Sequence, residues 1–589
     1  MKEFYKKRKN VHRRINCKAF TLIELLAVII ILAIIALITT PIIIISLKGA
    51  KMSAANSSAL SYIGGINKSL ESRSMERQSV KYDLYTLDDI NANNILSDDI
   101  KVTGKKPTDA IIFISENRVR NANICIDGYN VIYNGISSEV VGECDTLYKE
   151  KELNKAYPIY SSNMIPVIID NGDEDSQNAG KVYKADITDA DNPWYSYDSK
   201  KWANAVILKE DKTGKYKEKP FGTEIDSSDI ESYFVWIPRY AYKLFFDSLN
   251  YNSITENKPA TDGELAKLIE IEFGAKTTND DKAGECTTPM VSGENGQCVN
   301  GDYMTHPAFI SMNSNGIWIG KFETTGNEDN LSVLPNVSSL KSKTAKQMFE
   351  LAYNYKREND SHMMKNTEWG AVAYLSHSKY GIESEVRINN NVECKTGYAA
   401  TTKPECYGQQ CPTHELTENM PYNNPDYGYK ASTNGNISGI YDMSGGANER
   451  MAAYSESEQI YTEFSKSSIS KYADKYFDKY LSSASEKEKN TNEAQKSAEK
   501  EYNRMILGDA TGEMGPFYYY NDMNNDPNEE QSRPHNNWYQ DFSRFISNQK
   551  SWFLRGGFRY SESLGGQFYF IDTDGSSHGD VGFRLVLVQ

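Results

Sequence analysis

The chain has 589 residues, of which 39% are hydrophobic and 25% charged, so it holds enough apolar side chains for folded cores and is not wholly disordered. One domain per roughly 150 residues predicts about four domains. The net charge of −15 argues against a nucleic-acid-binding protein, because neutralising phosphates requires clustered Lys and Arg.

The basic residues cluster at the N-terminus, directly before a long apolar run. Residues 1–18 hold eight Lys or Arg, whereas residues 20–47 contain a single charged side chain, Glu24. As a helix this run would be about 42 Å long, enough to cross a hydrocarbon core of about 30 Å with the basic flank in the cytoplasm. Hydropathy alone also fits a simple signal anchor, but a carboxylate inside a spanning helix usually has a function.

The sequence KAFTLIELLAVIIILAII in this run resembles the type IV prepilin signal. The resemblance implies cleavage after Ala19 by a prepilin peptidase, N-methylation of Phe20, and pairing of the new amino terminus with Glu24 of a neighbouring pilin subunit. Pro41 lies where pilins carry a proline that bends the helix. The resemblance also implies insertion into the cytoplasmic membrane before assembly, then display on the cell surface or pilus.

The chain is predicted to have five parts, a prepilin leader, an assembly helix, a small β head, a connector module and a large C-terminal domain, at residues 1–19, 20–75, 76–150, 151–225 and 226–589. The second half of the helix has polar faces, so its apolar positions should lie on the head. The head holds short β-prone runs with a turn at Asp127-Gly128, similar to a pilin head. The connector contains Trp194 and Trp202, which favours a folded spacer over a flexible linker.

Seven cysteines follow the predicted leader. In an exported protein, Cys125 and Cys144 are expected to form a disulfide, and the alternative is a pair of free core thiols. Cys286 and Cys298 are predicted to close a second, shorter loop. Three further cysteines share one loop, so one of them should be unpaired; they are Cys394, Cys406 and Cys411.

Five landmarks occur in order in the last part of the chain: YFVWIPRYAYKL (233–244), PAFISMNSNGIWIGKFETTG (307–326), MMKNTEWGAVAYLS (363–376), GIYDMSGGANERMAAY (439–454), and SWFLRGGFRY with GDVGFRLVLV (551–588). Together they resemble the sulfatase-modifying-factor or formylglycine-generating-enzyme family, which implies a C-type-lectin-like fold of the α+β class. Apolar and polar residues alternate in WIGKFETT, which predicts a strand, and Asn366 is predicted to cap a helix.

The family's oxidases use two cysteines shortly after an Arg-Gly-Gly corner. In this chain Ser561 and Gly566 stand near the two expected positions, and no cysteine follows Cys411. Because thiolate chemistry requires a thiol, we expect a non-catalytic relative, not an enzyme.

The family resemblance also implies a calcium-binding site. In the family, a loop matching DMSGGANE binds Ca²⁺ through a side-chain oxygen, two carbonyls and a Glu, and oxygen ligands on a glycine-rich turn suit this ion. The alternative is a turn in which Glu449 pairs with Arg450 or a nearby Lys. By position, the implied ligands are Asp442, Gly445, Ala447 and Glu449.

Two more segments carry predictions. Residues 455–505 are rich in Lys and Glu, which predicts a solvated helical hairpin with Tyr472, Tyr476 and Tyr480 on one face. Residues 558–580 are the predicted ligand face, because aromatic and Arg side chains dominate binding hot spots. The alternative is that several of these residues belong to the core, since Phe568 and Phe570 alternate along the chain and one face of such a strand must be buried. The predicted contact residues are Phe558, Arg559, Tyr560, Ser561, Phe568, Tyr569, Asp572, Asp574 and His578.

We therefore expect a pilus-associated minor or tip subunit that displays a non-catalytic domain to an extracellular protein or glycan ligand. The stretch before GFRLV also resembles the variable proteins of diversity-generating retroelements. One alternative is a structural minor pseudopilin of a secretion or DNA-uptake machine. The other is an oxidase of the formylglycine-generating type, which the missing cysteine pair disfavours.

Overall fold

The structure is a computed structural model that contains both helices and sheets. It describes residues 22–75, 83–92, 95–97, 99–115, 118–133, 138–144, 156, 158–172, 178–187, 192–216, 219–244, 269–274, 304–402, 418–455, 466–480, 508–511, 518–519, 535–536, 539, 541–544, 546 and 550–589.

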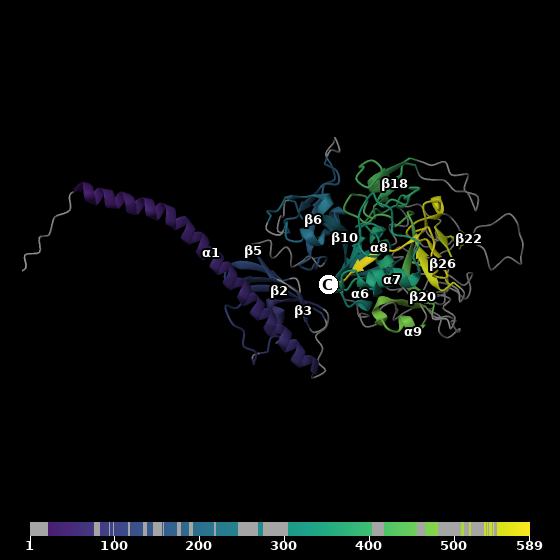
Figure 1. The fold of residues 1–589 in the computed structure, drawn as a ribbon. Coiled ribbons are helices and arrows are strands. Elements are labelled where there is room, and N and C mark those ends of the chain that lie inside the picture. The colour runs from purple at the N-terminus through teal and green to yellow at the C-terminus, as the bar shows by residue number, and fades with distance from the viewer. Residues whose placement is uncertain are drawn as a thin grey trace, which may run out of the picture.

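A single long helix, α1 (Leu22–Met75), opens the described chain. Its second half places small and apolar side chains three or four residues apart, so that they form one stripe along the helix. This stripe is buried against the head, as predicted; it consists of Ala55, Ala59, Tyr62, Ile63, Ile66 and Leu70. In Figure 1 the first half of the purple helix extends beyond the sheet on which the second half lies.

The head is one antiparallel sheet in chain order. Its elements are β1 (Asp83–Thr86), α2 (Leu87–Ala92), β2 (Asp109–Ser115), β3 (Arg118–Ile126), β4 (Tyr129–Tyr133) and β5 (Ser138–Glu143). Asp127 and Gly128 join β3 to β4 with φ values of 54° and 83°. Two successive residues at positive φ suit a two-residue hairpin turn, so the predicted turn is confirmed.

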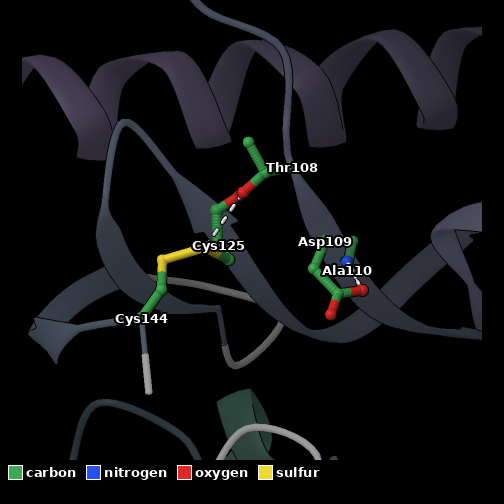
Figure 2. The surroundings of a disulfide bond; sticks show 5 residues. All are labelled: Thr108, Asp109, Ala110, Cys125 and Cys144. Atoms are coloured by element: carbon green, nitrogen blue, oxygen red, sulfur yellow. Dashed lines mark hydrogen bonds between the residues drawn. A yellow bond between two sulfur atoms is a disulfide. The ribbon is translucent and has the colours of Figure 1, made fainter. Parts of the chain in front are cut away.

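A disulfide joins the predicted pair Cys125 and Cys144, with their Cα atoms 5.6 Å apart. Figure 2 shows the bond beside Thr108, whose hydroxyl lies 3.3 Å from the Cys125 carbonyl oxygen. The cross-link ties the residue after β5 to β3. Cys286, Cys298, Cys406 and Cys411 lie outside the described residues, so the other cysteine predictions are not tested, apart from Cys394, which is a buried free thiol.

We expect Gly104→Ala to lower the stability of the head by about 1–3 kcal/mol. Gly104 has a φ of +93°, and a Cβ there would lie 2.3 Å from the Ser58 hydroxyl and 3.2 Å from the Ser58 Cα on α1. Gly64→Ala is the control, since a Cβ on this helical glycine meets no atom within 4 Å and should stabilise α1. Thermal unfolding of residues 48–150 compares the Gly104→Ala and Gly64→Ala variants. Equal melting temperatures for the two variants would contradict the expected clash.

The first large sheet crosses the predicted boundary at residue 225. Its strand order is β17-β28-β14-β10-β8-β6-β7-β9, so four strands from the predicted C-terminal domain and four from the predicted connector lie side by side in one sheet. The strands are β6 (Met164–Ile169), β7 (Val182–Lys184), β8 (Asn204–Leu208), β9 (Glu224–Ile225), β10 (Ile230–Pro238), β14 (Gly316–Gly320), β17 (His362–Met363) and β28 (Leu585–Leu587). The predicted division is corrected, because β8 pairs with β10 and no separate connector exists here.

A second large sheet has the order β21-β20-β25-β26-β24-β23-β22, with β27 beside β20. Its strands are β20 (Asn448–Ser455), β21 (Asp478–Tyr480), β22 (Tyr518–Tyr519), β23 (His535–Asn536), β24 (Phe542–Ser543), β25 (Trp552–Arg555), β26 (Phe570–Thr573) and β27 (Val581–Gly582). There are also three smaller sheets in the described residues. The first contains β11 (Tyr240–Leu244), β12 (Ile269–Phe273) and β13 (Met304–Thr305). The second pairs β15 (Thr325–Gly326) with β16 (Leu331–Ser332), and the third pairs β18 (Tyr398–Ala400) with β19 (Asn419–Pro421).

Four α-helices accompany these sheets in the described residues: α6 (Pro307–Ser311), α7 (Ala345–Asn354), α8 (Asn366–Ser376) and α9 (Lys466–Ile469). The predicted strand in WIGKFETT is confirmed only for its first three residues, because β14 ends at Gly320, and the predicted helix is α8. Its capping residue is Lys365, not Asn366, because the Lys365 N–H donates to the Glu368 carboxylate at 2.8 Å.

The described part of the predicted 455–505 hairpin is not a pair of helices. Tyr476 ends a short 3-10 helix and Tyr480 ends β21, which pairs parallel to β20. Both tyrosines are buried, and Tyr472 packs against the same core. The tyrosine spacing therefore reflects core packing, and the long-range pairing with β20 overrides the local helical periodicity.

The described residues form two hydrophobic cores that share no residue. One joins α1 to the head sheet, and the other runs from Ala156 to Val588. Residues 151–589 thus have a complete core of their own, and a fragment beginning at residue 226 would lack β6, β7, β8 and β9.

Candidate functional site

The predicted processing residues precede α1 in the sequence, and the predicted assembly residues fall within it. Ala19 and Phe20 lie outside the described residues. Glu24 and Pro41 fall within the bounds of α1, and the helix continues past the proline. Among the residues that the structure describes, no helix is both long enough and apolar enough to cross a membrane.

Several large apolar side chains of α1 are exposed in the single chain: Leu26 (55%), Ile30 (51%), Ile31 (56%) and Leu47 (56%). They precede the stripe that packs on the head, so the head does not cover them. An exposed apolar surface on one long helix suits lateral packing against other helices.

The predicted calcium ligands are buried: three precede β20 in the chain and Glu449 lies within β20. Glu449 is bonded by Arg584 through both carboxylate oxygens, with Nε 2.8 Å from Oε2. Asp442 accepts the Gly397 N–H at 2.8 Å and the Asn389 amide at 2.8 Å. Gly445 and Gly446 adopt positive φ in this segment.

This donor set does not fit a calcium ion, because the Glu449 carboxylate is already neutralised by a buried guanidinium. Ala447 contributes its N–H to another carboxylate, Glu323, at 2.9 Å. No group of three or more His, Cys, Asp or Glu in the described part of the chain is placed to hold a metal ion. The predicted alternative partner, Arg450, instead donates to the carbonyls of Gly575 and Ser576 at 2.9 and 2.7 Å.

Glu323 is a buried acid that sequence analysis missed. Its carboxylate accepts the Ser339 hydroxyl and the Ala447 N–H. Burial, with the nearby carboxylates Asp442 and Glu449, raises the pKa of Glu323 well above its ordinary value near 4.5. The signal was the position of Glu323 three residues after β14, but Ala447, Asp442 and Glu449 come from a segment more than 100 residues away.

The raised pKa of Glu323 predicts a pH-dependent stability. Above about pH 4.5 the unfolded chain releases this proton and the folded chain keeps it, so stability should fall as pH rises from 4.5 toward the folded pKa. Glu323→Gln stays uncharged and should flatten this fall. Urea unfolding of residues 151–589 at pH 5 and pH 8 measures the change, with surface Glu328→Gln as control. Equal pH slopes for wild type and Glu323→Gln would contradict the prediction.

The structure separates the nine predicted ligand-face residues into buried and accessible groups. Ser561, Phe568 and Tyr569 are buried, so the prediction that they contact a ligand is not supported. Phe568, Tyr569 and Phe570 are buried in succession, so both sides of this stretch are covered, and the Phe568 ring lies 5.0 Å from the His377 ring. Asp572 is bound by Arg544 at 2.6 Å, and Asp574 accepts the Ser576 N–H at 2.9 Å.

Three neighbouring residues are half-buried on one turn: Phe558, Arg559 and Tyr560. The rings of Phe558 and Tyr560 meet edge to face at 5.9 Å, and the Arg559 guanidinium lies 4.5 Å from the Tyr560 ring. Arg559 also donates to Asp580 at 2.6 Å and to the Cys394 sulfur at 2.9 Å. We call these three residues the aromatic–arginine patch. The exposed His578 lies on the following loop.

The prokaryotic N-terminal methylation motif matches residues 14–40. A search of curated proteins finds no match to the chain. The matched motif supports a type IV pilin-like surface protein or pseudopilin. It implies processing by a prepilin peptidase, insertion into the membrane, and assembly with other pilin subunits at the surface.

Proposed function

We propose that this pilin-like chain is a minor or tip subunit whose residues 151–589 form a non-catalytic, C-type-lectin-like domain that binds an extracellular ligand. The observation that carries the proposal is the aromatic–arginine patch, because Arg and aromatic side chains that are partly exposed on a fixed turn are typical of binding hot spots. The ordered landmarks of the sequence support the family resemblance.

The patch rests on a rigid base. Gly556 and Gly557, directly before it, have φ values of 82° and 76°. Arg555 is fully buried and donates to the carbonyls of Asp509 at 2.9 Å and Ala510 at 3.0 Å. A turn held in this way presents Phe558, Arg559 and Tyr560 at little cost in conformational entropy upon binding.

The two positions where the family's oxidases carry cysteines support the non-catalytic part of the proposal. Ser561 is buried, and its hydroxyl accepts the Phe558 N–H at 3.0 Å. At Gly566, a Cβ would lie 2.2 Å from the Asp541 carboxylate, so a cysteine could not enter without displacing it. We expect residues 151–589 to show no thiol-dependent oxidation of a cysteine-containing peptide.

The resemblance to the variable proteins of diversity-generating retroelements belongs to the same proposal. The aromatic–arginine patch lies between two strands of the second large sheet, β25 and β26, and the chain then ends in the core strand β28. Such an arrangement lets surface residues vary while the strands on both sides keep the fold. A near-identical template repeat and a reverse transcriptase gene beside the locus are the expected finding.

The test is binding of residues 151–589 to a printed panel of glycans and purified extracellular-matrix proteins. We expect at least one ligand to bind wild type and to be lost in the double variant Arg559→Ala/Tyr560→Ala. Lys212→Ala, an exposed change elsewhere in the domain, should leave binding intact. Absence of any ligand would favour the alternative of a structural minor pseudopilin. Binding that survives the double variant would show that the aromatic–arginine patch is not the binding site.

A further inference from the structure

A hollow of about 650 Å³ lies at one end of the first large sheet, within the range of small-molecule sites. We call it the β6–β7 hollow. It is formed by the end of β6 and the residues after it, by β7, and by two further segments that supply Asn192, Lys201 and the Phe221-Gly222 turn. None of the nine predicted ligand-face residues lines it, so it is a separate feature of the domain.

An exposed aromatic ring stands at this hollow. Phe221 is 46% exposed, and it is the one phenylalanine among the exposed large hydrophobic side chains of the described residues. An isolated exposed apolar residue is ordinary, but this one lines a cavity and is held in place. The Lys184 ammonium lies 5.4 Å from the centre of its ring.

The turn that carries the ring is anchored to β7. The Lys184 ammonium donates to the carbonyl oxygens of Lys219 at 2.9 Å and Tyr216 at 3.2 Å. The Gly222 N–H donates to the Lys184 carbonyl at 2.8 Å. The ring is therefore a fixed platform, and little ordering would be needed when a ligand stacks on it.

The polar groups of the hollow are balanced in charge and held by the protein. The lining includes two carboxylates, Asp170 and Asp186, and two ammonium groups, Lys184 and Lys201. The Asp170 carboxylate accepts the Gly172 N–H at 2.8 Å, and the Lys201 ammonium donates to the Asn192 side-chain oxygen at 3.0 Å. The hollow thus offers acceptors and donors together, with no net charge to attract an ion.

We propose that the β6–β7 hollow binds a saccharide, with one sugar ring stacked on Phe221. The C–H face of a pyranose is weakly positive and complements the negative face of an aromatic ring. Sugar hydroxyls donate and accept at once, so they can meet the Asp carboxylates and Lys ammonium groups together. An anion would lie near the two carboxylates, and a wholly apolar ligand would displace water from these charged groups without replacing its hydrogen bonds.

The test uses residues 151–589, which have their own core, on a printed glycan array, followed by calorimetric titration with the glycan that binds best. Phe221→Ala should weaken binding about tenfold or more, and Phe221→Trp should retain it, because it keeps a stacking face. Thermal melting checks that both variants fold.

The controls separate this proposal from the aromatic–arginine patch. Phe558→Ala should leave glycan binding at the hollow unchanged. Failure to bind any glycan, or equal affinity of wild type and Phe221→Ala, would overturn the proposal. Loss of binding in Phe558→Ala but not in Phe221→Ala would assign the glycan to the patch, which overturns the inference here and supports the proposed function.

Discussion

Replacing Arg584 by Met is expected to lower the free energy of unfolding of residues 151–589 by about 3–5 kcal/mol. The fully buried guanidinium binds both oxygens of Glu449, and it also donates to the carbonyls of Gly320 at 2.8 Å and Tyr441 at 2.9 Å. Its removal leaves Glu449 without a counter-charge beside two other buried carboxylates, Glu323 and Asp442.

Urea unfolding measures this loss, and two further variants interpret it. Glu449→Gln combined with Arg584→Met should recover part of the stability, because the stranded carboxylate is gone. Lys479→Met removes an ion pair with Asp474, whose side chain is 87% exposed, and should cost less than about 1 kcal/mol. A loss for Arg584→Met no greater than for Lys479→Met would show that the buried pair does not hold the sheets together.

Gly370→Ala should unfold the domain or destabilise it by about 3 kcal/mol or more, although Ala normally favours a helix over Gly. Gly370 lies inside α8, and a Cβ there would be 1.9 Å from the Gly508 carbonyl oxygen and 2.9 Å from the Asp509 carbonyl carbon. The opposing atoms are backbone. They are also fixed, since the carbonyl of Asp509 accepts from the buried Arg555.

The matched control is Gly214→Ala, because a Cβ at Gly214 meets no atom within 4 Å. Its thermal unfolding midpoint should stay within a few degrees of wild type. If Gly370→Ala behaved like Gly214→Ala, residues 508–511 could not lie against α8 as described.

Features set by local sequence could be predicted. The apolar run predicted α1, the spacing of its later apolar residues predicted the face on the head, and Asp127-Gly128 predicted the β3–β4 turn. Each depends on residues within a few positions of one another, where periodicity and turn preferences act directly.

Features set by distant pairing could not be predicted. β8 joins β10 across the predicted boundary at residue 225, and strand β21 forms only because β20 lies beside it. Glu449 and Arg584 are 135 residues apart, so the sequence suggested a calcium ion for Glu449, or else Arg450 or a nearby Lys, and not Arg584. Burial also decides the ligand face: the alternation of Phe568 and Phe570 predicts one covered side, whereas the intervening Tyr569 is buried as well.

The central claim is that a processed pilin helix displays the domain at the cell surface. The most direct measurement is mass spectrometry of the N-terminal peptide of the protein recovered from purified surface fibres. A peptide that begins at N-methylated Phe20 is the predicted result. A mature protein that still begins at Met1 would contradict the account.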